Sequence, residues 1–251
     1  APDPYRRGGK RTLLHLGNFS AAQFATAINP LYGAPQSIYT DHFQWQDGAT
    51  GPMGYQLEVP PLHPALAATL FGGYGETNAE HMAQLPNTHM MLALMRDGFH
   101  PDSPGGNVEL RADGSPVLDY SVTPYSWDGL RRAFHSMAEI QFAAGASAVM
   151  PLHSDAHYLK TLGETREHIN NLSLERYRTR LASAHVMGGC AMGENPHLAV
   201  TDSLGRHHQL RNLSIHDGSL FPTSIGANPQ LSVYALTAKL ATELAQRLKN
   251  P

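Results

Sequence analysis

The sequence predicts an α+β protein built on an antiparallel sheet with helices covering one side. Three observations predict this fold. Residues 107–111 and 117–122 alternate apolar and polar side chains around a Gly-containing turn, which is typical of a β-hairpin. An apolar stripe at helical spacing follows over residues 127–142. The chain is 251 residues long and 41% hydrophobic, so it can bury a substantial core.

The composition excludes several classes of partner and site. Lys and Arg number 18 against 21 Asp and Glu, so there is no basic surplus for nucleic acid or an anionic membrane. The longest apolar runs, such as residues 90–95, are too short for a transmembrane segment. One cysteine, Cys190, excludes a disulfide framework. The best-spaced histidine pair, His153 and His157, has no third ligand near it, so we expect no metal site.

The first part of the chain is irregular. Residues 21–27 are a short stretch with the composition of a helix. Residues 31–75 are dense in turn-forming residues, with β-type pieces at 37–45 and 55–59 between them. Residues 81–96 fit either a strand or a helix, because their apolar run has no clear period.

The middle of the chain gives clearer signals. Pro124 comes just before the apolar stripe, and Gly145 is placed to end that helix in the left-handed conformation. Leu174, Tyr177 and Leu181 then predict another short helix.

The last helix is expected to run from Pro229. Its buried side is expected to hold Leu231, Tyr234, Ala238, Ala241, Leu244 and Ala245. Asn228 is a favourable N-cap and Pro229 a favourable first helical residue, so the positive end of the helix should lie near whatever Asn228 faces. Upstream, residues 213–215 predict a short buried strand that presents Asp217. Gly218 has no Cβ and lets another molecule approach the backbone.

Complete nucleotide-binding and serine-nucleophile motifs are missing from the sequence. It contains no G-x-S-x-G elbow. The glycines of residues 188–193 have the spacing of a phosphate loop, but Glu194-Asn195 follows where Lys-Ser/Thr is needed. Gly73-Tyr74-Gly75 lacks the third glycine of a dinucleotide fingerprint.

Three linked motifs near the C-terminus resemble one family. They are His185-x-Met187-Gly188-x-Cys190-x-Met192-Gly193, then Asn212-Leu213 with Asp217-Gly218-Ser219 and Pro222, and then Gly226-x-Asn228-Pro229 before an apolar helix. In this order they resemble the C-terminal end of the glucose–methanol–choline (GMC) flavoprotein oxidoreductases, closest to the alcohol- and sterol-oxidising branches. Residues 32–37 and 106–146 resemble more loosely that family's substrate domain.

The resemblance implies FAD as cofactor and oxidation of an alcohol to a carbonyl, with hydride transfer to flavin N5. His185 matches the family's active-site histidine and would accept the hydroxyl proton, since a side chain titrating near neutrality suits that role. Asn228 would hydrogen-bond the substrate oxygen. Both are the catalytic residues that the resemblance implies.

The same resemblance implies the flavin contacts. Asp217 and Gly218 would touch the ribityl–phosphate portion of FAD. Asn228, Pro229 and Gln230 would place the start of the last helix near the N1–C2=O edge of the flavin, where a positive helix end stabilises negative charge.

The family's opening strand and G-x-G-x-x-G turn are not in the sequence. The resemblance therefore implies a partner, an N-terminal FAD-binding half or subunit that carries this motif. It divides the chain into residues 1–12, leading from that half, residues 13–176, a substrate-binding domain, and residues 177–251, the C-terminal part of a Rossmann-like FAD domain. No signal-peptide pattern opens the chain, and we assign no cellular location.

Two alternatives stay open beside the alcohol dehydrogenase or oxidase. One is a hydroxynitrile-lyase-like enzyme on the same scaffold, in which the flavin is structural and His185 does acid–base work. The other is a non-catalytic fragment that acts as a binding module. The alcohol and the electron acceptor are both unassigned. A hydrophobic alcohol would suit the apolar residues of the first half, which are Phe43, Trp45, Met90, Met91 and Trp127.

Overall fold

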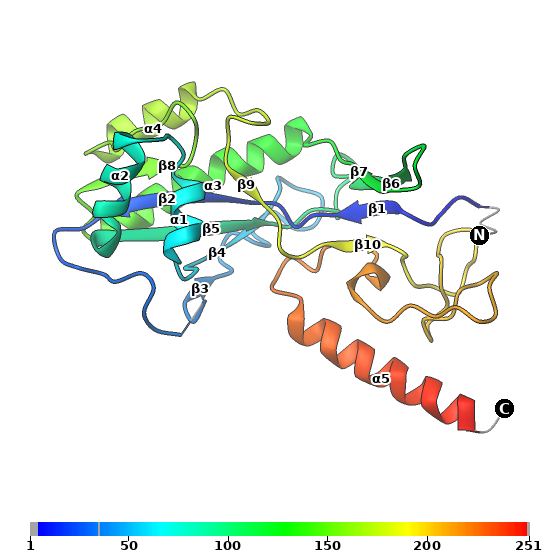
Figure 1. Cartoon of the computed structure of the whole chain (residues 1–251). Helices are drawn as coiled ribbons and strands as arrows, with labels where there is room; N and C mark the ends of the chain where they lie inside the picture. The colour runs from blue at the N-terminus through cyan, green and yellow to red at the C-terminus, as the bar shows by residue number, and fades with distance from the viewer. Residues whose placement is uncertain (1–4, 35, 250–251) are drawn as a thin grey trace.

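Two antiparallel sheets form the frame of the computed structural model, which describes residues 5–34 and 36–249 (Figure 1). The six-stranded sheet has the order β3 (Tyr39–Thr40), β4 (Tyr55–Glu58), β5 (Thr88–Met95), β2 (Gly17–Gln23) and β8 (Ala148–Pro151), with β9 (Leu181–Ala182) also paired to β2. The four-stranded sheet has the order β10 (Met187–Gly189), β1 (Lys10–Leu13), β6 (Gly106–Leu110) and β7 (Pro116–Asp119). The α+β class and the β6–β7 hairpin are confirmed.

The main core lies between the six-stranded sheet and helix α3 (Pro124–Ala143), which crosses one side of that sheet (Figure 1). Phe134 and Met137 of α3 are fully buried with residues of β4 and β5. Thr123 caps the helix by accepting a hydrogen bond from the Ser126 N–H, and Gly145 follows it with a φ of 94°. The helix predicted from the apolar stripe is therefore confirmed.

Further helices and turns complete the fold. They are α1 (Pro64–Leu70), α2 (Glu76–Ala83), the 3-10 turn η1 (Leu85–Asn87), α4 (Leu162–Asn171), the 3-10 turn η2 (Gly218–Leu220) and α5 (Gln230–Lys249). Within the described part of the chain, no helix has the length and apolarity that a bilayer crossing needs. Residues 1–4 of the predicted leading segment lie outside the described residues, as does Pro35 within the motif at residues 32–37.

The helix expected over residues 21–27 is wrong, because residues 21–23 end strand β2 and residues 24–27 form neither a helix nor a strand. Strand β2 pairs with β5 on one edge and with β8 and β9 on the other, and almost all of it is buried. A strand buried on both faces shows no period-two alternation, so its small residues read equally well as a helix. Residues 88–95, which fitted either a strand or a helix, form strand β5. They are also mostly buried, so their sequence shows no alternation either.

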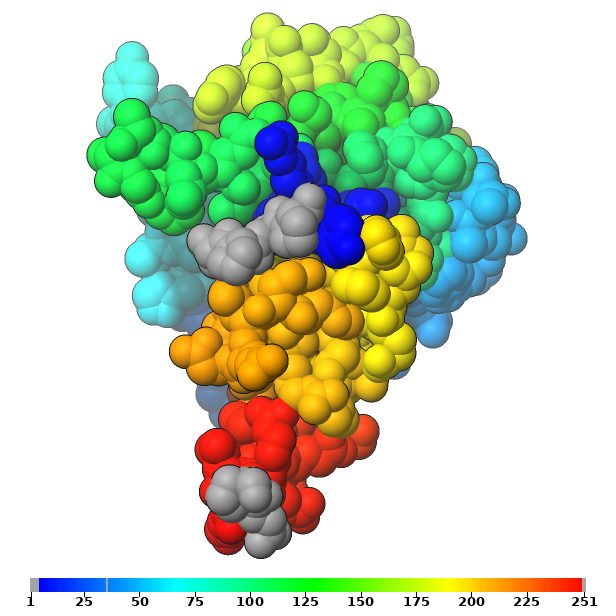
Figure 2. Space-filling view, turned by 90° about the vertical axis from the view of Figure 1, so that its right-hand side faces the viewer, coloured from blue at the N-terminus to red at the C-terminus, as the bar shows by residue number. Residues whose placement is uncertain are grey.

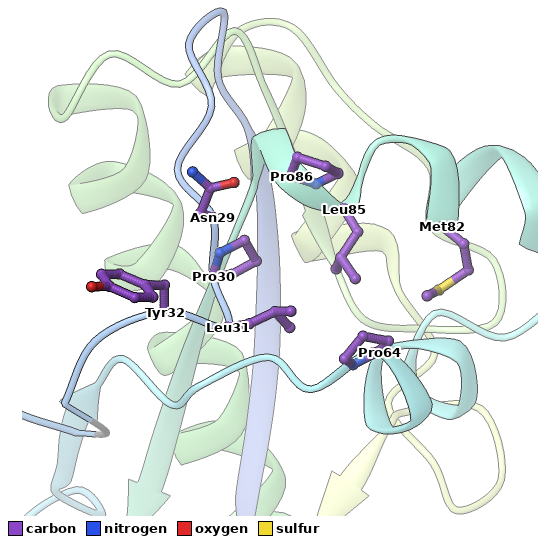
Figure 3. Close-up of a pocket in the computed structure, with 8 residues that line it drawn as sticks. All are labelled: Asn29, Pro30, Leu31, Tyr32, Pro64, Met82, Leu85 and Pro86. Carbon is purple, nitrogen blue, oxygen red and sulfur yellow. The ribbon is translucent and has the colours of Figure 1, made fainter.

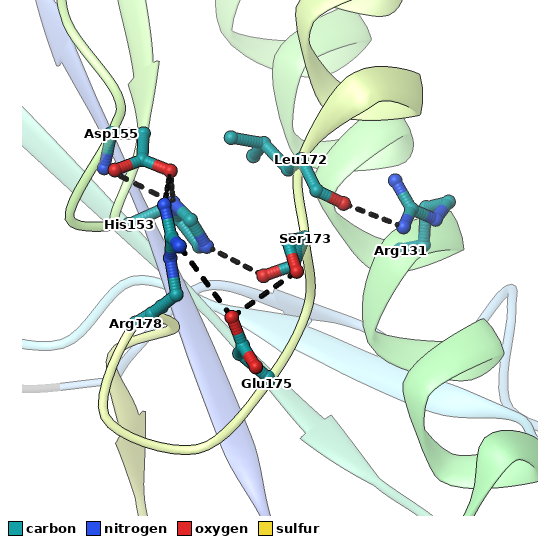
Figure 4. Close-up of polar contacts among 7 residues, drawn as sticks. All are labelled: Arg131, His153, Asp155, Leu172, Ser173, Glu175 and Arg178. Carbon is teal, nitrogen blue, oxygen red and sulfur yellow. Dashed lines mark hydrogen bonds and ion pairs between the residues drawn. The ribbon is translucent and has the colours of Figure 1, made fainter.

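The short helix expected around Leu174, Tyr177 and Leu181 is also wrong. Residues 173–180 contain one turn at 176–178 and no helix, and Tyr177 is 93% exposed with a φ of 70°. Figure 4 shows the polar contacts that hold this segment, in which Arg178 pairs with both Asp155 and Glu175. The helix of this region is α4, which begins earlier, after the Thr161 cap.

His153 and His157 do not share a helix face, because residues 153–157 form turns rather than a helix. Both ring nitrogens of His153 are engaged: Nε2 donates to the Ser173 carbonyl at 3.0 Å, and Nδ1 accepts from the Asp155 N–H at 3.1 Å (Figure 4). Over residues 5–34 and 36–249, no three His, Cys, Asp or Glu side chains are grouped so that they could hold a metal ion.

Helix α5 has two apolar faces, and the sequence prediction chose the one that this chain leaves exposed. Leu231 is 80% exposed and Tyr234 is 60% exposed, whereas Leu240 on the opposite face is buried. The exposed apolar face of α5 comprises Leu231, Tyr234, Ala238, Ala241, Ala245 and Leu248. The helix projects from the end of the molecule (Figures 1 and 2). The spacing of apolar residues alone does not show which of the two apolar faces of a helix packs against the rest of its own chain.

The strand expected at residues 213–215 is reduced to one isolated bridge between Ser214 and Arg206. Leu213 is 41% exposed, so this segment is not a buried strand. Residues 190–217 are instead a series of turns that leads the chain back to Asp217.

Candidate active site

The loop that carries His185 is joined to the Asp217–Gly218 turn. Past strand β10, the Cys190 N–H donates to the Ser219 carbonyl at 3.0 Å. Two residues on, the Met192 N–H donates to the Leu220 carbonyl at 2.9 Å. The first two sequence motifs therefore lie side by side.

The third motif, which begins at Gly226, is connected to His185 through a residue that the sequence analysis did not identify. His15, in the link between β1 and β2, is fully buried, and its Nδ1 lies 3.0 Å from Nδ1 of His185. The backbone of Gly226 faces the same His15 ring. The Gln44 side-chain amide also donates to the Gly226 carbonyl. His15 thus lies between the His185 loop and the segment that leads to Asn228.

Asn228 does not cap α5. The first hydrogen bond of the helix runs from the Val233 N–H to the Pro229 carbonyl, so Pro229 takes the N-cap place and the helix begins at Gln230. The Asn228 side-chain amide is directed elsewhere and donates to Glu58 Oε2 at 2.8 Å. The amide nitrogen of Asn228 therefore points toward Glu58.

Glu58 on strand β4 is a candidate site residue that sequence reasoning missed. Its side chain is 1% exposed and also accepts hydrogen bonds from Gln36 at 2.8 Å and from Gln56 at 3.4 Å. Burial raises the pKa of Glu58, and the hydrogen bonds from Asn228, Gln36 and Gln56 oppose that shift. The sequence did hold one indication of this residue: Gln56 and Glu58 are two polar residues, two positions apart, in a short β-type segment.

His185 itself is half-buried, and burial lowers its pKa. A neutral imidazole at neutral pH can accept a proton, which is the condition for a base. Its Nε2 makes no hydrogen bond within residues 5–34 and 36–249, so that nitrogen is available to a ligand.

Two of the places expected to contact the flavin, Asp217 and the start of α5, are open to solvent. Asp217 is exposed, and its Oδ1 accepts the Ser219 N–H at 2.8 Å, which orders the turn at Gly218. The first residues of α5, Gln230 and Leu231, are exposed, and N–H groups in the first turn of a helix have no partner within it. Exposed N–H groups at a helix start can meet an anionic group of a ligand.

Among the described residues, two apolar cavities lie in the first 144 residues of the chain. One, of about 620 Å³, is bounded by the loop at residues 29–32 and by α1 and α2, and holds none of the predicted site residues (Figure 3). The other, of about 400 Å³, is lined by Glu58 together with Leu57, Met91 and Ile140. Of the apolar residues named from the sequence, Met91 lines this second cavity. Phe43 instead stacks on Tyr55, and Trp45 lies 4.0 Å from the Arg96 guanidinium.

Comparison with known proteins decides the family. Residues 101–237 match the sequence model of the family described as GMC oxidoreductase. The chain belongs to the GMC oxidoreductase family. The match spans more than half of the chain, from the β6–β7 hairpin to the middle of α5, and confirms the resemblance drawn from the three motifs.

Individual GMC relatives are distant in sequence. An uncharacterised GMC-type oxidoreductase of Mycobacterium tuberculosis is 24% identical over 96% of this chain and 36% of its own length. A long-chain-alcohol oxidase of Arabidopsis thaliana is 26% identical over 76% of this chain and 26% of its own length. Formate oxidase of Aspergillus oryzae superposes with a TM-score of 0.65 at 14% identity, over 98% of this chain and 48% of that one. The chain thus spans about a third or less of the length of these curated relatives and about half of the solved structure. FAD is the cofactor of the GMC family.

The buried His15 predicts a specific acid response of stability. Burial and the neighbouring His185 lower its pKa from the usual 6.5 to about 3. Between these values the unfolded chain binds a proton that the folded chain does not. We therefore expect the free energy of unfolding to fall as pH drops from about 6.5 to about 3, by up to about 1.4 kcal/mol per pH unit from this residue.

The measurement is denaturant unfolding of wild type and His15→Asn at a series of pH values. Asn does not titrate, so the wild-type curve should lose stability more steeply below about pH 6.5. Parallel curves for the two proteins would show that His15 is not held neutral.

Proposed function

We propose that this chain forms the substrate-side part of an FAD-dependent enzyme that oxidises an alcohol to a carbonyl compound. One observation supports the proposal: His15 contacts both His185 and the backbone of Gly226, two residues before Asn228, and on this basis we assign His185 and Asn228 to one site. When bound, FAD supplies a hydride acceptor at N5 for the carbinol carbon.

The residues of this chain would handle the hydroxyl group. His185 takes the hydroxyl proton at Nε2, and burial lowers the pKa of the ring, which keeps the imidazole neutral at neutral pH. Asn228 uses one amide N–H on Glu58, and its other N–H holds the substrate oxygen. Glu58 thereby orients Asn228 and is not itself required to move a proton.

The flavin contacts follow the assignments made from the sequence. Asp217 and Gly218 meet the ribityl–phosphate portion, and the α5 start at Pro229 and Gln230 meets the N1–C2=O edge. The adenine end of FAD is held by an N-terminal FAD-binding half, which also covers the exposed apolar face of α5. In this proposal residues 13–176 form the substrate domain and residues 177–251 belong to the FAD domain.

The cavity beside Glu58 supports a hydrophobic alcohol as substrate. It is lined mainly by apolar side chains and shares Glu58 with the Asn228 contact. We place the apolar part of the substrate there. Each additional methylene that the cavity buries is worth roughly 0.8 kcal/mol, so kcat/KM should rise by about fourfold per carbon until the cavity is full.

The experiment mixes the FAD-loaded assembly with a series of primary alcohols of increasing chain length, without oxygen. We expect the visible flavin absorbance to be lost, faster for longer chains. A flavin that keeps its colour while a cyanohydrin is cleaved would favour the lyase, and an assembly that never holds FAD would favour the binding module. Either result contradicts the proposal.

A further inference from the structure

The contact between His15 and His185 restricts which ring nitrogens carry protons, as well as where the two rings lie. The two Nδ1 atoms are 3.0 Å apart, and the rings are 5.1 Å apart between centroids. When both imidazoles are neutral, one proton lies between these two nitrogens. Either His15 donates and the proton of His185 is on Nε2, or His185 donates and its Nε2 is free to accept.

The backbone at His15 is held in an unfavourable conformation. Its φ of 50° is in the left-handed region, which a residue with a Cβ adopts at a cost. The carboxylate of Asp97, 1% exposed, accepts the N–H groups of both Leu14 and His15 at 3.2 Å. The Tyr120 hydroxyl donates to the same Asp97 oxygen at 3.1 Å. This clamp fixes where the His15 ring lies.

The other side of the His15 ring indicates its tautomer. The Gly226 backbone raises the pKa of His15, which is the effect of a carbonyl acceptor facing a ring N–H. Nε2 of His15 is buried and has no fully formed hydrogen bond among the described residues. Because Nδ1 already lies against His185, we assign the Gly226 effect to Nε2, where a proton would have a carbonyl to face and a lone pair would be buried without a donor. With the proton on Nε2, Nδ1 of His15 is an acceptor.

We propose that His15 is a positioning residue, whose Nδ1 accepts the Nδ1–H of His185 and so leaves Nε2 of His185 unprotonated toward the substrate. The proposal rests on the proposed function for its catalytic consequence. When His185 takes the substrate proton at Nε2, its Nδ1–H still donates to His15. That hydrogen bond becomes charge-assisted and stronger as the positive charge forms. His15 stays neutral throughout and does not touch the substrate.

Two variants separate this role from simple packing. His15→Phe keeps a ring of similar size but has no acceptor. His15→Asn keeps an acceptor close to the Nδ1 position, and Asn tolerates a positive φ better than most residues. In the FAD-loaded assembly we expect His15→Phe to lower kcat roughly 10–100-fold with little change in KM. We expect His15→Asn to recover most of that loss.

The tautomer is read directly by ¹⁵N NMR of histidine-labelled protein, with His185 assigned from the signal lost in His185→Ala. We expect the proton of His185 on Nδ1 in the wild type and in His15→Asn, and a shift toward Nε2 in His15→Phe. A wild-type His185 protonated on Nε2, or a wild-type kcat in His15→Phe, would overturn the proposal. If the tautomers are as expected but no alcohol bleaches the flavin, the proposed function fails while the positioning by His15 stands.

Discussion

His185→Ala is expected to slow flavin reduction by alcohol roughly 10²–10⁴-fold, because a positioned proton acceptor contributes about that much to such a step. The flavin should stay bound, since the residues assigned to its ring and ribityl end, such as Gly218 and Gln230, are on other segments. The measurement is rapid mixing of the FAD-loaded variant with substrate, following the visible absorbance of the flavin. Imidazole added to the buffer should restore part of the rate by entering the space left by the side chain.

A second histidine of the same chain is the matched control. His197 is exposed and its ring lies tilted against that of Tyr5, with centroids 4.2 Å apart, and among the described residues it forms no hydrogen bond or ring contact with His15 or His185. His197→Ala should reduce its flavin at the wild-type rate. Reduction of the His185→Ala flavin at that same rate would remove His185 from the chemistry.

The sequence predicted those parts of the fold that local physics decides. The β6–β7 hairpin follows from alternation around a turn, and α3 follows from a stripe with an N-cap before it and a glycine after it. The elements that failed depend on distant partners. Strand β2 looks helical until β5 and β8 are placed against it, and α4 has a weak apolar pattern that only the packing against α3 makes significant.

The candidate site was predicted in part for the same reason. His185 and Asn228 are in motifs that can be read along the chain. His15 and Glu58 are each 170 residues away from the partner they contact, and neither has a motif around it. Their roles arise from burial and from hydrogen bonds to residues far away in the sequence, which no local pattern encodes. The predicted N-cap at Asn228 was wrong because the helix begins one residue later, with Pro229 in the N-cap place, and the Asn228 side chain is directed to Glu58 instead.

The exposed apolar face of α5 gives the second large prediction, which tests the N-terminal FAD-binding half as a partner. Leu231 and Tyr234 project from this chain at 80% and 60% exposure, while the opposite face packs through Leu240. A patch of this kind usually marks an interaction surface. We expect the double variant Leu231→Glu, Tyr234→Glu to lose roughly 3 kcal/mol or more of binding energy to that half, about a hundredfold in affinity.

The test co-expresses the two segments as separate chains and measures both their association by ultracentrifugation and the FAD retained. Gln246→Glu is the matched control, because it adds a negative charge to an exposed polar position of the same helix, between the two apolar faces. The control should assemble and be yellow, whereas the double variant should be colourless and dissociated. Both outcomes have one cause: the N–H groups at the start of α5 can meet the flavin edge only when the helix is held against the half that carries the rest of the cofactor. If the double variant assembles and holds FAD as the wild type does, α5 is not the contact with the FAD-binding half.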